Sequence, residues 1–106
     1  MTAILDQIRH TLREANIVST ERQFCELWLG KSECYTRSLR FTQTAPSPDA
    51  LSNCAARLAW VATQLRAQDT TKHRYWAEQL EDLQIKCYQA MGQLSQNKWR
   101  QKGVAA

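Results

Sequence analysis

Residues 24–41 read FCELWLGKSECYTRSLRF, and this stretch decides the expected fold. Its first half has the apolar spacing of a helix face that ends at Gly30, a residue type that commonly terminates helices. Ser32 can cap a following short helix, in which Tyr35 and Leu39, four residues apart, would face inward. The stretch therefore predicts two consecutive short helices joined by a tight turn.

Apolar spacing predicts three further helices around this stretch. Residues 2–15 carry apolar side chains at steps of three and four, with Thr2 as the expected N-cap. A helix capped by Ser47 follows over residues 48–68 and has the densest apolar stripe of the chain. A long helix is expected over residues 72–98. The helix over residues 48–68 is therefore the expected spine of the core.

The long helix over residues 72–98 has a heptad spacing of apolar side chains, which requires a partner helix. Two partners fit: residues 48–68 in an antiparallel hairpin, or the same helix of a second subunit. Trp60 lies off the main stripe of its own helix and could join an exposed partner surface. The residues expected at a dimer or partner interface are Trp60, Trp76, Leu80, Leu83, Cys87 and Leu94.

The expected fold class is all-α, a five-helix protein with a helix-turn-helix bundle of four helices and a long C-terminal helix. The bundle would span residues 1–68, and residues 69–106 would pack on it or dimerise. With 43% hydrophobic and 23% charged residues the chain can bury a core. Its three Gly and two Pro residues are too few for the turns of a sandwich or barrel.

Catalytic and metal-binding motifs are not expected in this chain. Its 106 residues leave no room for a large two-lobed catalytic cleft, and its four cysteines contain no Cys-x-x-Cys pair. Free cysteines behave as small core residues, which is typical of a reduced, cytoplasmic protein. No run of about 18 apolar residues and no signal-peptide pattern occurs. We therefore expect no enzyme, no cofactor, no metal and no membrane association.

Several residues from the turn onward fall at spacings that a known family shares: Leu29-Gly30-Lys31-Ser32, Leu39, Pro46-Ser47, Leu51, Ala55 and Leu58. With them, residues 3–66 resemble the Cro and phage-repressor (Xre-type) helix-turn-helix family. In that family a Leu-Gly-x-Ser turn precedes the recognition helix, and Pro-Ser opens the fourth helix. The resemblance implies sequence-specific binding to double-stranded DNA, usually as a homodimer on paired half-sites, and thus a transcriptional regulator such as a repressor.

The second and third helices diverge from the family pattern. The family has a small residue at the position of Glu26 and a branched apolar residue at the position of Thr36. A shift of the second helix by one residue would place Cys25 at the small position. Tyr35 could then replace the missing apolar residue, on a third helix that is rotated.

The resemblance also implies which side chains would contact DNA. Arg37 is the expected donor to guanine edges, whereas Arg40 and Lys31 are suited to phosphates. Residues 20–44 contain four basic and three acidic side chains, so this surface is nearly neutral although the whole chain carries a net charge of +4. The complete set of expected DNA-binding residues is Arg22, Lys31, Ser32, Glu33, Thr36, Arg37, Ser38 and Arg40.

A second hypothesis requires no DNA. The same bundle could be a non-enzymatic protein-interaction module, an inhibitor or adaptor of the kind that phages and mobile elements encode. Trp60, the long helix or its basic end around Trp99 would then contact the protein partner. The basic residues at that end also suit the helix dipole alone. Salt dependence of DNA binding separates the two hypotheses.

Overall fold

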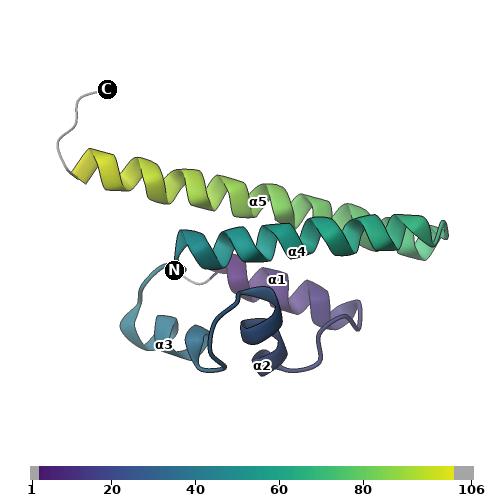
Figure 1. Ribbon diagram of the computed structural model, residues 1–106, viewed down its shortest axis with the longest axis horizontal. Coiled ribbons are helices and arrows are strands. Elements are labelled where there is room, and N and C mark those ends of the chain that lie inside the picture. Colours follow the sequence, from purple (N-terminus) through teal and green to yellow (C-terminus); the bar gives the residue numbers. More distant parts are fainter. Residues whose placement is uncertain (1–2, 102–106) are drawn as a thin grey trace.

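The computed structural model describes residues 3–101, and these residues form helices and connecting turns without any strand (Figure 1). The helices are α1 (Ala3–Glu14), α2 (Glu21–Gln23), the π-helix η1 (Phe24–Trp28), α3 (Tyr35–Thr42), α4 (Pro48–Ala67) and α5 (Thr71–Gln101). Because α2 runs into η1 without a break, the two count as one helix. The all-α, five-helix fold class is confirmed.

The core of the molecule is built largely on α1 and α4. The buried side chains of α1 are Leu5, Ile8 and Leu12. Ser47 caps α4 as expected, because its side-chain oxygen accepts a hydrogen bond from Ala50 N at 3.1 Å. The buried side chains of α4 are Ala50, Leu51, Cys54, Ala55, Leu58 and Ala62. The expected cap at Thr2 lies outside the described residues.

The second helix changes its pitch after one turn. Thr20 caps it, and from Phe24 onward it is a π-helix, in which Leu29 N donates to Phe24 O at 3.2 Å. That hydrogen bond reaches five residues back instead of four, so the turn holds one extra residue. Cys25 is consequently buried and Glu26 is exposed, as the one-residue shift predicted.

The turn after η1 is fixed by glycine and by a contact with α4. Gly30 has a φ of 67°, and Lys31 N donates to Cys25 O at 2.9 Å, which closes the helix end. From α4, Asn53 Nδ2 donates to Leu29 O at 3.2 Å. The turn is thereby tied to the core helix.

The structure places the start of α3 later than the spacing predicts. Cys34 occupies its cap position without a side-chain hydrogen bond, so the predicted cap at Ser32 is wrong. Ser32 O instead accepts a hydrogen bond from Tyr35 N at 3.1 Å within the turn. The hydroxyl oxygen of Tyr35 accepts from Ser47 N at 2.9 Å, and this contact anchors the start of α3 to the start of α4.

We expect Gly30→Ala to lower the free energy of unfolding by about 2 kcal/mol. The added carbon would be strained at a φ of 67° and would lie 2.7 Å from Asn53 Nδ2, which must then leave Leu29 O. Gly92→Ala in α5 is the matched control, because no described atom lies within 4 Å of its added carbon. That variant should gain about 0.5 to 1 kcal/mol. Urea unfolding measures both, and changes of the same sign would contradict this account.

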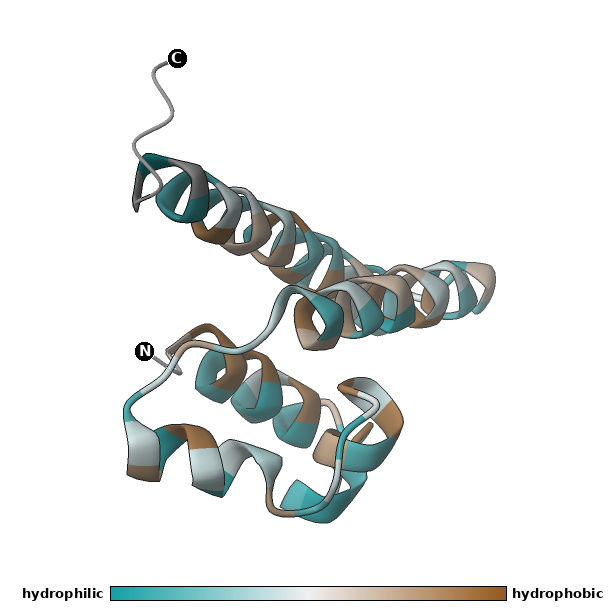
Figure 2. Cartoon of the chain, turned by 60° about the vertical axis from the view of Figure 1, so that its left-hand side comes forward, coloured by the Kyte–Doolittle hydropathy of each residue, from teal (hydrophilic) through white to brown (hydrophobic). Residues whose placement is uncertain are grey.

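The helix α5 packs along α4, and the two form a hairpin (Figures 1 and 2). The α5 residues buried in the core are Leu80, Leu83 and Cys87, with Ala77. The prediction that the first three face a second subunit is wrong, because α4 of the same chain supplies the matching apolar stripe. Trp76 and Leu94 are half-buried, and Leu94 packs against the same core. Trp60 alone of the predicted interface residues is mostly exposed, at 60%.

No helix between residues 3 and 101 combines the length and the apolar character needed to cross a bilayer. Within the same range, His, Cys, Asp and Glu side chains nowhere gather in the groups of three that could hold a metal ion.

Candidate nucleic-acid interface

The helix α3 lies on the side of the molecule away from α5 (Figure 1). The chain reaches it through α2, η1 and the turn at Gly30, and leaves it at Gln43, whose left-handed φ of 55° ends the helix. The order of two short helices joined by a turn is therefore the one that the sequence predicted. The outward face of α3 is free of cover from the long C-terminal helix.

The inward face of α3 carries Thr36 and Leu39. Thr36 was predicted to contact DNA, and the structure contradicts this because the residue is only 2% exposed. Its hydroxyl donates to Glu21 Oε1 at 2.7 Å and lies 3.5 Å from Cys25 Sγ. A polar residue is tolerated at this buried position because both neighbours satisfy its hydroxyl. The helix is consequently not rotated to bring Tyr35 into the place of Thr36.

The hydrogen bond from Thr36 lowers the pKa of Glu21 below its ordinary value of 4.5, against the opposing effect of partial burial, and the charge of Arg40 adds to the lowering. A depressed carboxyl pKa stabilises the fold above the unfolded-state pKa, and this stabilisation is lost as the pH falls through the folded-state value.

We expect Thr36→Val to lower the free energy of unfolding by about 0.5 to 1 kcal/mol at neutral pH, because Glu21 loses its donor while staying partly solvated. The deficit should shrink below a pH of about 4.5 as Glu21 becomes protonated. Thr42→Val is the matched control on α3, since its hydroxyl donates to the Ser38 carbonyl and not to a carboxylate. Denaturant titrations across this pH range should show a pH-dependent deficit only for Thr36→Val.

The outward face of α3 presents a mixed polar and aromatic surface. Arg37, Ser38, Phe41 and Thr42 line a surface hollow of about 270 Å³. Phe41 is 90% exposed, although it is a large apolar side chain. Arg37 forms no ion pair or hydrogen bond with any described residue. Arg37 is therefore the cation of α3 that is available to a ligand, as the sequence predicted.

The predicted phosphate contacts Lys31 and Arg22 are already paired with carboxylates. Lys31 Nζ lies 2.9 Å from Asp49 Oδ2, at the start of α4. Arg22 Nε lies 2.7 Å from Glu26 Oε1 and 3.5 Å from Glu33 Oε2. The predicted site residues Ser32 and Glu33 are exposed beside these pairs. Pairing leaves the rim of α3 nearly neutral.

Arg40 has a different place from the other cations. Its guanidinium lies 2.9 Å from Asp6 Oδ1 of α1 and 3.2 Å from Glu21 Oε1 of α2. These contacts link three helices, and the hydrogen bond with Asp6 raises the pKa of Arg40 despite partial burial. Arg40 therefore holds α3 against the bundle, and it is not available to phosphate without breaking that link.

A family model described as "Family of unknown function (DUF6626)" matches residues 5–100. The chain belongs to the DUF6626 family. Neither a curated protein nor a solved structure matches it. The match of this DUF6626 chain covers α4, most of α1 and nearly all of α5, so the hairpin and the helix-turn-helix bundle fall within one family unit.

Sequence reasoning missed two residues of the candidate interface in this DUF6626 protein, Phe41 and Thr42. Phe41 follows Leu39 by two residues, which places it off the buried face of a helix. An aromatic side chain at such a position, with polar neighbours, was the available signal.

Proposed function

We propose that the protein binds the major groove of double-stranded DNA with the outward face of α3 and acts as a cytoplasmic transcriptional regulator, repressing by occupancy. The observation that carries this proposal is the unpaired guanidinium of Arg37 beside Ser38 and Phe41 on an uncovered helix. Arginine can donate two hydrogen bonds to guanine, and an exposed phenylalanine can contact a thymine methyl group.

Phosphate contacts would come from Lys31 and Arg22. Each would have to exchange a carboxylate for a phosphate, so part of the electrostatic gain is offset by the broken ion pair. The pairs are solvent-exposed and individually weak, which permits the exchange. The proposal therefore expects modest non-specific affinity, with discrimination that depends on Arg37.

Binding as a homodimer on two half-sites about one helical turn apart remains part of this proposal. The apolar stripe of α5 is not available for it, because it is buried against α4. A second copy would therefore have to associate through another surface, or only on the DNA.

The test is selection of duplexes from a random pool, followed by fluorescence anisotropy at increasing salt. Two phosphate contacts predict that the logarithm of the association constant falls with that of salt at a slope of about −2. Failure to enrich any sequence, or binding that ignores salt, would reject the DNA proposal. Either result would favour the protein-interaction module.

A further inference from the structure

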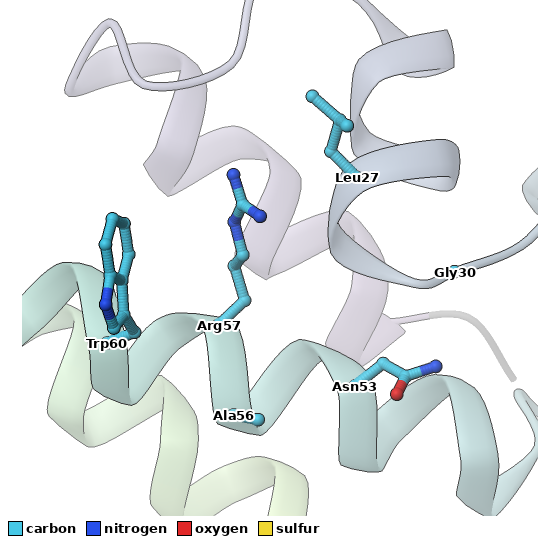
Figure 3. Close-up of a pocket in the computed structure, with 6 residues that line it drawn as sticks. All are labelled: Leu27, Gly30, Asn53, Ala56, Arg57 and Trp60. Atoms are coloured by element: carbon cyan, nitrogen blue, oxygen red, sulfur yellow. The ribbon is translucent and has the colours of Figure 1, made fainter.

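A second surface lies between η1 and α4, apart from the outward face of α3. Figure 3 shows it as a groove of about 500 Å³ with Leu27 and Gly30 on one side. Asn53, Ala56, Arg57 and Trp60 line the opposite side along α4. The long side chains of Arg57 and Trp60 rise from α4 next to one another, toward the helix that carries Leu27.

The walls of this groove expose two large apolar side chains. Leu27 is 56% exposed and Trp60 is 60% exposed, whereas the neighbours of Leu27 on η1, such as Trp28, are buried in the core. Exposed leucine and tryptophan across one groove are typical of a protein-binding surface, where tryptophan often dominates the binding energy.

Arg57 supplies the charge of the groove. Its guanidinium carbon lies 5.6 Å from the ring centre of Trp28 and 6.0 Å from that of Trp60. No carboxylate between residues 3 and 101 forms an ion pair with it. Aromatic contacts orient a weakly hydrated guanidinium and leave its donors free for a planar anion such as a carboxylate.

The groove is preformed, because its lining belongs to the fixed turn. The hydrogen bond from Asn53 to Leu29 O holds η1 at a set distance from α4, and Gly30 permits the close approach of the two. From Asn53 to Trp60 the wall spans two helical turns, or about 10 Å. A ligand helix of similar length could lie along it.

We propose that this groove docks an amphipathic helix of another protein, one that presents an aspartate or glutamate beside a large apolar side chain. The carboxylate would pair with Arg57, and the apolar side chain would lie between Leu27 and Trp60. Charge complementarity selects this partner over a nucleic acid, because a phosphate backbone requires several cations and Arg57 is the one that lines the groove. The site is independent of the DNA-binding proposal.

The test uses two capped helical peptides of about 15 residues. One carries leucine and glutamate four residues apart on one face, and the other has glutamine in place of each glutamate. In NMR titrations the glutamate peptide should move the Leu27 amide and the Trp60 indole signals. Arg57→Gln should weaken its binding about tenfold and remove its advantage over the glutamine peptide. Trp60→Ala should weaken both peptides.

Arg13→Gln on α1 is the matched control for charge, and it should bind the glutamate peptide as the unchanged protein does. Both Trp60 and Arg57 are exposed, and amide spectra of the variants would verify that they fold. Equal binding of the two peptides, or no movement of these signals, would overturn the proposal. So would displacement of the peptide by duplex DNA, or a homodimer that Trp60→Ala dissociates. Arg37 takes no part, so failure here leaves the DNA test unaffected.

Discussion

Leu83→Asp is expected to unfold the protein and not to release a folded monomer from a dimer. Leu83 is 3% exposed in the α4–α5 hairpin, so the variant loses the apolar contacts of a core leucine and must bury a carboxylate. Together these effects cost more than about 4 kcal/mol, a large share of the roughly 5 to 15 kcal/mol that stabilises a typical domain. Circular dichroism at room temperature should report loss of most of the helix signal.

Ile85→Asp is the matched control for this prediction. Ile85 lies two residues further along α5 and is 55% exposed, so the same change should alter the free energy of unfolding by less than about 0.5 kcal/mol. A Leu83→Asp variant that melts like the unchanged protein but has half its mass would show that the stripe joins two subunits. That outcome would overturn the hairpin packing described above.

Arg37→Ala is expected to weaken binding to the selected duplex by about 10- to 100-fold. Arg37 has no ion pair to break, so its donors are free to contact a guanine edge. Affinity for unrelated sequences should fall far less, because those complexes rely on phosphate contacts. Anisotropy with the selected and a scrambled duplex measures the ratio of the two affinities.

Two control variants separate base reading from general charge. Lys31→Ala removes a rim cation and should weaken all duplexes alike, with a smaller salt slope. Arg13→Ala removes an equal charge from α1 and should leave the affinity ratio unchanged. If Arg37→Ala and Lys31→Ala lower every affinity by the same factor, Arg37 contacts the backbone and the proposed reading of bases is wrong.

The apolar stripes of the sequence predicted the helices well, because core packing imposes the helical period on buried residues. The stripe from Leu51 to Leu65 and the cap at Ser47 needed no knowledge of the rest of the chain. Heptad spacing alone could not decide whether α5 packs on α4 or on a second subunit, since both partners satisfy the same pattern.

The errors on α3 arise from contacts between residues distant in sequence. Thr36 looked like an outward polar residue, but its hydroxyl is buried because Glu21, 15 residues earlier, accepts its proton. The groove beside Trp60 was also not predictable as a whole. Leu27 and Arg57 belong to different helices, and only the packing of η1 on α4 brings them together.

The distribution of the thiols gives the protein a built-in label site. Of the four cysteines, all within the described chain, only Cys34 is exposed. The neighbouring Cys87 thiol and burial raise the pKa of Cys54, so that sulfur stays protonated and slow to react. A maleimide dye added to the native protein should therefore attach at the first turn of α3 without any engineered cysteine. Reaction at the other three sulfurs would occur only when the fold opens, and its rate would time that opening.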